Sequence, residues 1–221
     1  AEGRWVTTHE GIAFDTRGRL IDGQHRLAAI VASGVSLFLW VFRDLPEDAI
    51  QVINRGKART MAHRLQCLGF AASDNDTVAV ARAMMTGVKM NWRELVTESD
   101  LVDFIAAHED AIVWAKKMAP KGQASAVLRA AVARAYYHVD SQTLERFCLA
   151  ATDRLEAGHL TETDQSVRRF AEAMRRASRT GVERVAGYRK WQSAIRHYAD
   201  GDRIVKVYGQ ERDLFPPPEG T

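Results

Sequence analysis

A five-residue run, Asp22-Gly23-Gln24-His25-Arg26, contains the residue types that bind phosphate groups. A short apolar segment ends just before it and a helical pattern begins within it, so the run is predicted to form the turn between a strand and a helix. The free N–H groups and positive dipole end of a helix start attract anions, glycine lets the backbone approach a ligand, and arginine adds paired donors. This pattern predicts a phosphate-binding turn.

Each polar residue of this run has a structural interpretation beside the functional one. Asp22 is either the N-cap of the helix or a catalytic acid, and Gly23 serves either the turn itself or the approach of phosphate. His25 is a candidate for phosphate contact or proton transfer. Arg26 either holds phosphate or ties down a neighbouring carboxylate or carbonyl. We take Asp22 and His25 as candidate catalytic residues, and Gly23, Gln24, His25 and Arg26 as candidate ligand contacts.

A second candidate group has three cations at alternate positions around a glycine, namely Arg55, Lys57 and Arg59. This arrangement is typical of a contact to nucleotide phosphate or to the DNA backbone, and equally of a solvent-facing loop. Thr60 is predicted to cap the helix that follows, with a phosphate contact as its second role.

The third candidate surface is basic. Residues 163–206 contain eleven Lys and Arg against five Asp and Glu, although the whole chain has a net charge of only +3. Spacings of seven on the predicted helix 164–179 place its arginines on one stripe, opposite its apolar residues. Such a stripe either follows a DNA backbone or is an ordinary solvated face. The candidate nucleic-acid contacts are Arg168, Arg169, Arg175, Arg176, Arg179, Arg189 and Lys190.

The elements that position these residues change in kind along the chain. Residues 1–70 mix strand and helix signals, whereas the pattern from about residue 73 onward is helical. The first part is predicted to contain a hairpin around 16–18, a helix over 23–33, a buried strand over 35–42 and helices at 45–52 and 60–68. Predicted helices in the second part are 78–90, 98–108, 111–118, 124–138, 141–157, 164–179 and 182–199.

We therefore predict an α+β fold with a mixed domain over residues 1–70, a helical domain over 71–208 and an extended, mobile tail over 209–221. A strand-rich domain of only about 70 residues looks incomplete, so we expect further residues upstream of Ala1. Tyr188, Trp191 and Tyr198, in the last helix, are predicted to be core residues rather than stacking platforms for bases.

Composition favours a soluble cytoplasmic protein. Hydrophobic residues make up 46% and charged residues 27% of the 221 residues, and no apolar run approaches membrane-spanning length. Cys67 and Cys148 lie far apart in apolar helical patterns and are predicted to be reduced packing residues. The spacing of histidine, cysteine and acidic residues predicts no metal site.

The phosphate-binding run and its context resemble the ParB/sulfiredoxin superfamily, and within it the DGQHR-type proteins of phages and DNA-modification islands. The resemblance covers roughly residues 1–70. It rests on Gly3-Arg4-Trp5, the 11–21 hairpin, the DGQHR run and the segment 54–60, where Asn54 stands in place of the usual aspartate. It implies a ParB/sulfiredoxin-like domain with a nucleotide or phosphate pocket at the strand-to-helix turn. No cysteine lies in this turn, so sulfinate reduction, which sulfiredoxin performs, is not expected.

Three hypotheses of function stay open. The first is a DNA-associated protein of a phage or mobile element that acts in DNA modification, its regulation or partitioning, with a nucleotide or DNA phosphate in the pocket. The second is an enzyme that hydrolyses a nucleoside triphosphate or transfers its phosphate, with Asp22 or Glu10 as base and Mg²⁺ shielding the phosphates. The third is an interaction scaffold with a vestigial pocket. The expected partners are DNA, a nucleotide and, as in related proteins, a second copy of the chain, but no membrane.

Overall fold

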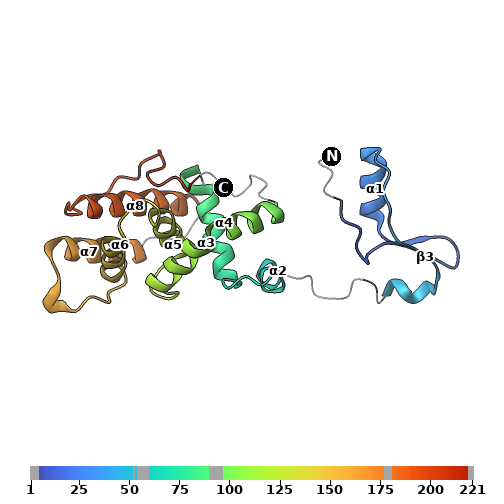
Figure 1. Ribbon diagram of the computed structural model, residues 1–221, viewed down its shortest axis with the longest axis horizontal. Coiled ribbons are helices and arrows are strands. Elements are labelled where there is room, and N and C mark those ends of the chain that lie inside the picture. Colours follow the sequence, from blue (N-terminus) through green and yellow to red (C-terminus); the bar gives the residue numbers. More distant parts are fainter. Residues whose placement is uncertain (1–4, 52, 54–59, 90–96, 177–180, 219–221) are drawn as a thin grey trace. The chain divides into compact units, whose positions relative to one another are not determined.

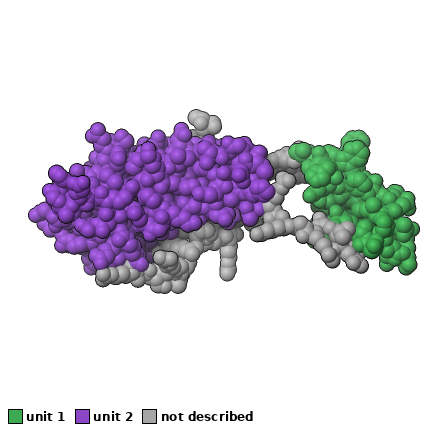
Figure 2. All heavy atoms as spheres, turned by 90° about the horizontal axis from the view of Figure 1, so that it is seen from below, with its two compact units in different colours: residues 1–58 green, residues 59–221 purple. Residues whose placement is uncertain are grey.

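The computed structural model describes residues 5–51, 53, 60–89, 97–176 and 181–218. The chain divides into two compact units, residues 1–58 and 59–221 (Figure 2). Unit 1 contains the sheet and unit 2 contains most of the helices, so the chain is mixed α+β and mostly helical, as predicted. The boundary falls before the predicted one at residue 70, because the helix predicted at 60–68 packs against a helix of unit 2.

Unit 1 has a three-stranded sheet in the order β2-β1-β3. Figure 1 labels its strand β3 and the helix α1 of the same unit. β1 (Ile12–Asp15) pairs antiparallel with β2 (Leu20–Asp22) and parallel with β3 (Val41–Leu45). Helix α1 (Gln24–Ser33) follows β2, and the 3-10 helix η1 (Glu47–Gln51) follows β3. The hairpin and α1 agree with the predicted elements, and α1 begins directly after the strand that carries the turn.

The β1–β2 hairpin is held by the buried carboxylate of Asp15. This carboxylate accepts hydrogen bonds from the backbone N–H of Arg17 at 2.9 Å and of Arg19 at 2.8 Å, and from Nε of Arg19 at 2.7 Å. Burial alone would raise the pKa of Asp15, but these donors outweigh it and lower the pKa. Gly18 completes the turn with a φ of 74°.

The strand predicted over 35–42 is displaced along the chain and exposed, so the expectation of a buried strand is wrong. β3 begins only at Val41, and Phe38 and Trp40 before it are 91% and 61% exposed. β3 lies at the edge of the sheet and has a neighbouring strand on one side only. A continuous apolar run indicates that a segment favours burial. Whether the segment is buried depends on other elements that pack over it, and the run itself does not determine these.

Unit 2 contains seven α-helices among its described residues. Side chains of Thr60, Asp74, Thr97, Ser125 and Asp140 each accept a backbone N–H at a helix start. The α-helices are α2 (Met61–Cys67), α3 (Asn75–Thr86), α4 (Glu98–Met118), α5 (Ala126–Ala135), α6 (Ser141–Ala151), α7 (Glu162–Arg176) and α8 (Gly181–Ala199). Two 3-10 helices, η2 (Gly87–Lys89) and η3 (Ala157–His159), complete the set.

Helix α5 forms the centre of unit 2. It packs against α3, α4 and α8, and every residue from Leu128 to Ala135 is buried. Its alanines allow the neighbouring helices to approach closely. The two helices predicted at 98–108 and 111–118 both lie within α4, which has a kink between them at His108, where the backbone is not helical (φ −127°).

The tail, predicted to be mobile, is extended but docked on unit 2. Phe215 is fully buried, and Nε of Arg134 donates to its carbonyl at 2.8 Å. Gln192, also fully buried, accepts the backbone N–H of Leu214 at 3.0 Å. The prediction of a mobile tail is therefore wrong over these residues, because one apolar side chain and two buried polar ones fix the backbone.

Tyr188, Trp191 and Tyr198 are buried, which confirms their predicted core role. Cys148 is buried as predicted, whereas Cys67, in the last turn of the short helix α2, is exposed; both cysteines are free thiols. Within the described part of the chain, we find no helix whose length and apolar character would let it cross a membrane.

Candidate functional site

The turn between β2 and α1 is shaped by Gly23. Gly23 is the N-cap of α1, with a φ of 87° that favours glycine. A Cβ atom at this position would lie 2.5 Å from Cγ2 of Ile12 in β1, so the turn also needs glycine to pack against the sheet. Packing of the protein alone therefore accounts for this glycine, whether or not a phosphate approaches it.

Asp22 is not the N-cap of α1, which corrects the structural role predicted for it. Its Oδ1 accepts the backbone N–H of Gly23 at 2.7 Å, one residue before the helix begins. The N-cap itself is a glycine, which has no side chain to accept a backbone N–H in the first turn of α1. Because the N-cap lacks a side chain, the N–H groups at this helix start are left to other acceptors.

Arg26 reaches back from α1 to the segment that precedes β1. Its Nη1 donates to the carbonyl of Gly11 at 2.5 Å, and its Nη2 pairs with Oε2 of Glu10 at 2.5 Å. The side chain is 27% exposed, and these bonds use two of the five guanidinium donors. Arg26 therefore links α1 to the segment directly before β1, and its guanidinium has further donors that these two bonds do not use.

Gln24 and His25 occupy the first turn of α1, and both are exposed. Together with Asp22, Gly23 and Arg26 they form a polar rim around the uncapped helix start, with Glu10 beside it. In chemical terms, this rim offers backbone N–H donors, an imidazole, an amide and a guanidinium whose charge is shared with one carboxylate. Such a group can bind an oxyanion at the surface of unit 1.

The pairing of Arg26 with a carboxylate and a carbonyl confirms the structural role predicted for it as one of two alternatives, but the sequence did not identify Glu10 and Gly11 as the partners. Sixteen residues separate Arg26 from Glu10, and no local pattern links them. The residue type indicates only that an arginine in a structural role holds a neighbouring carboxylate or carbonyl, and it does not identify the residue that provides it.

The second predicted group cannot be placed at this site. Arg55, Lys57 and Arg59 lie outside the described residues. Thr60 belongs to unit 2, where its Oγ1 accepts the backbone N–H of His63 at 3.2 Å and caps α2, as predicted. The described residues also contain no group of three or more histidine, cysteine or acidic side chains that is arranged to hold a metal ion.

The predicted arginine stripe on α7 is exposed, but its described members also have partners within unit 2. Arg168 pairs with Asp153 at 2.5 Å, Nε of Arg169 donates to a carbonyl one turn earlier, and Nη2 of Arg175 donates to the Ala151 carbonyl at the end of α6 at 2.7 Å. The side chain of Arg176 and all of Arg179 lie outside the described residues.

Two further predicted contacts lie on α8. Arg189 donates to the Val88 carbonyl at 3.2 Å and pairs with Glu211 at 3.4 Å, so this side chain also joins segments of unit 2. Lys190 is exposed. The exposed members of the predicted basic surface are therefore the three arginines of α7 and Lys190, whereas Arg189 is half-buried.

Comparisons with protein-family models, with curated proteins and with solved structures return no match for this chain.

Proposed function

We propose that the chain is a ParB-like, DNA-associated protein that binds a phosphate group, of a nucleotide or of DNA, at the start of α1. The observation that carries this proposal is the uncapped first turn of α1, which is rimmed by exposed Gln24 and His25 and by Arg26. An oxyanion at this point would accept backbone N–H groups that the N-cap glycine has no side chain to cap, and it would lie at the positive end of the helix dipole.

Glu10 sets the strength of this site. Its carboxylate competes with phosphate for Arg26, so the bound anion must displace or share that ion pair. Phosphates with more negative charge compete better, because the guanidinium fork suits a doubly charged oxyanion. The proposal therefore favours a terminal phosphate over a phosphodiester at equal concentration.

DNA association is supported by the exposed arginines of α7. Arg168, Arg169 and Arg175 place three cations on the exposed surface of one helix. Contacts from such a helix to a DNA backbone carry little sequence information but depend strongly on salt.

The phosphate proposal is tested by measuring the affinity of ATP, CTP and GTP for the wild type, for His25→Ala and for Gln24→Ala. Each variant is expected to weaken binding about fivefold, which corresponds to the loss of one hydrogen bond of about 1 kcal/mol. The matched control is His63→Ala, which removes another exposed histidine near a helix start, this time in unit 2. Equal affinities in all four proteins would overturn the proposal and leave the interaction-scaffold hypothesis.

An enzyme that uses a nucleoside triphosphate is the second candidate, and the position of Glu10 favours it. This carboxylate lies beside the guanidinium that would hold phosphate, where a general base or an Mg²⁺ ligand would act. Glu10→Gln separates the two candidates: it should abolish phosphate release by an enzyme while strengthening the binding of the same nucleotide. If the wild type and the variant release phosphate at the same rate, the enzyme proposal fails and the binding proposal is unaffected.

A further inference from the structure

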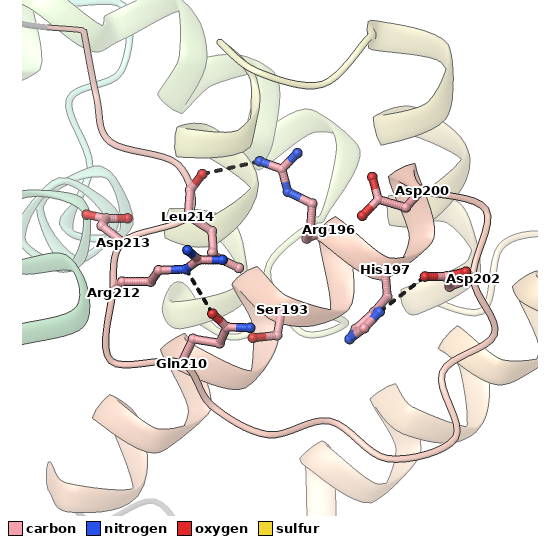
Figure 3. Close-up of a pocket in the computed structure, with 9 residues that line it drawn as sticks. All are labelled: Ser193, Arg196, His197, Asp200, Asp202, Gln210, Arg212, Asp213 and Leu214. Atoms are coloured by element: carbon pink, nitrogen blue, oxygen red, sulfur yellow. Dashed lines mark hydrogen bonds and ion pairs between the residues drawn. The ribbon is translucent and has the colours of Figure 1, made fainter.

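A polar hollow lies in unit 2, between α8 and the segment that returns along it (Figure 3). Its volume is about 560 Å³, within the range of sites for small organic ligands. Nine residues line it, and Leu214 is the only apolar one among them. A ligand for this hollow must therefore be recognised through hydrogen bonds and charge.

One wall of the hollow is a single stripe of α8. Ser193, Arg196 and His197 follow one another at helical spacing, which places them on the same side of the helix, and Asp200 lies directly after the last residue of α8, with its N–H donating to the Arg196 carbonyl. Arg196 and Asp200 are one turn apart and of opposite charge, yet the structure holds no ion pair between these two described side chains (Figure 3). The guanidinium of Arg196 turns instead toward Phe215 and the Leu214 carbonyl, which is 3.5 Å from its Nη2.

The other wall is fixed in place by the buried side chain of Gln192. Its Nε2 donates to the carbonyls of Gln210 at 3.3 Å and Arg212 at 2.9 Å, while its Oε1 accepts the N–H of Leu214. These bonds hold the backbone that presents Arg212 opposite α8. One wall of the hollow is therefore a helix, and the other is a segment that hydrogen bonds from this helix hold in place.

Several lining groups already have partners. Asp213 pairs with Arg134, Asp202 lies 3.6 Å from Nδ1 of His197, and Ser193 donates to a carbonyl within α8. Nε of Arg212 donates to the Gln210 side chain at 3.0 Å, which leaves its terminal nitrogens for a ligand. Among the described residues, the Asp200 carboxylate has no ion pair or side-chain hydrogen bond with another lining residue.

We infer that this hollow binds the phosphate ester of a sugar, the chemistry shared by free sugar phosphates and mononucleotides. Arg196 and Arg212 come from opposite walls and offer guanidinium donors to phosphate. Asp200 offers acceptor oxygens to sugar hydroxyl groups, a pairing that acidic residues make with ribose in nucleotide sites. The carboxylates of Asp200 and Asp202 disfavour a simple anion, so the sugar contributes to binding as well as the phosphate.

The experiment follows the backbone amide signals of residues 193–202 and 210–214 by NMR while ribose 5-phosphate, AMP, ribose or inorganic phosphate is added. Ribose 5-phosphate and AMP are expected to give saturable shifts, and ribose alone to give none. If AMP binds about tenfold more tightly than ribose 5-phosphate, the ligand is a mononucleotide; if the two bind equally, it is a sugar phosphate. No saturable shift with either ester would overturn the inference.

Two variants test whether Arg212 and Asp200 contact the ligand. Arg212→Gln should weaken both esters about tenfold, as expected for the loss of a charge-assisted hydrogen bond. Asp200→Asn should weaken ribose 5-phosphate, because an acceptor for its hydroxyl groups is lost, but strengthen the weaker binding of inorganic phosphate, because a repelling negative charge is removed. The matched control is Arg203→Gln, which removes a cation that pairs with Glu162 outside the hollow. An unchanged affinity in Arg212→Gln, with folding verified by its amide spectrum, would contradict the inference whatever happens at α1.

Discussion

Arg26 and Glu10 form an ion pair, 2.5 Å between Nη2 and Oε2, at the mouth of the proposed phosphate site. The pair has two consequences that oppose each other. It fixes the guanidinium beside the start of α1, and it places a negative charge where an anion would bind. The affinity of this site for phosphate therefore depends on a carboxylate that precedes β1 as well as on the turn.

Removing the Glu10 charge should strengthen phosphate binding. In Glu10→Gln the guanidinium keeps an uncharged neighbour and faces the ligand with its full charge, so we expect affinity for ATP to rise about threefold to tenfold. Equilibrium binding at low salt measures this change. Glu47→Gln is the control, because Glu47 pairs with Arg17 and Arg19 elsewhere in unit 1. A weaker affinity in Glu10→Gln would mean that Glu10 positions Arg26 more than it competes with the ligand.

The turn at Gly23 should tolerate alanine much less well than the hairpin turn at Gly18. Both glycines have positive φ, but a Cβ at Gly18 meets nothing within 4 Å, whereas a Cβ at Gly23 meets Ile12 at 2.5 Å. Gly18→Ala should cost about 1 kcal/mol and Gly23→Ala about 2 to 5 kcal/mol, because overpacking is added to backbone strain. Hydrogen exchange at the Ile12 amide, which donates to the Trp40 carbonyl, reports the stability of unit 1 directly. Equal protection in the two variants would show that the close approach to Ile12 is not maintained in solution.

Asp164 should make the stability of unit 2 depend on pH. Burial raises the pKa of its fully buried carboxylate, but hydrogen bonds from Arg146, Tyr198 and Thr161 outweigh burial and lower the pKa from 3.8 to about 2. A depressed pKa stabilises the folded state above pH 3.8, and this contribution is lost as the pH falls toward 2. We expect Asp164→Asn to lose about 2 kcal/mol at pH 7 and to flatten the pH dependence of unfolding between pH 5 and pH 2.

The control for this experiment is Asp74, whose pKa is also lowered to about 2. Burial raises this pKa, and donors from Lys116 and Thr77 lower it by more. The Asp74 side chain is 62% exposed, so solvent screens its ion pair, and Asp74→Asn should cost clearly less than Asp164→Asn. Chemical denaturation at several pH values compares the two. A larger loss of stability in Asp74→Asn than in Asp164→Asn would indicate that the pairing of Asp164 with Arg146 and Tyr198 does not persist in solution.

The contribution of α7 to DNA binding can be measured from the salt dependence of the affinity. Replacing Arg168 and Arg169 with glutamine should reduce the slope of log affinity against log salt by about 2 for duplexes of any sequence. The double variant Arg82→Gln, Lys117→Gln removes two exposed cations from other helices and should leave the slope unchanged. Retention of DNA with the same slope in both double variants would remove α7 from the interface.

Local sequence signals predicted the order of the helices of unit 2 but not all of their ends: the helix predicted at 141–157 ends at Ala151, and the one predicted at 78–90 begins at Asn75. They predicted unit 1 only in part. Thr60 caps α2 as predicted; Asp74 and Asp140 also precede apolar periodic segments and cap helices, although neither was predicted as a cap. The β1–β2 hairpin and α1 follow from Gly18 and Gly23 in the same way. These features depend on interactions between residues close in the chain, which is why a single sequence reveals them.

The features that sequence reasoning missed depend on distant residues. Phe38 and Trp40 belong to an apolar run, but their exposure depends on which strands and layers surround β3. The docked position of Phe215 depends on Arg134, 81 residues away. The partner of Arg26 likewise lies in a different element. Burial and pairing of this kind are decided by the tertiary arrangement, and no local spacing encodes them.

The central claim, that phosphate binds at the uncapped start of α1, is tested most directly by the backbone amide signals of Gly23, Gln24, His25 and Arg26 during a titration with inorganic phosphate and then with ATP. The account predicts saturable downfield shifts that are largest at these amides and become larger in Glu10→Gln. If these four amides stay unchanged while the nucleotide binds elsewhere, or if no binding occurs in either protein, the account is contradicted.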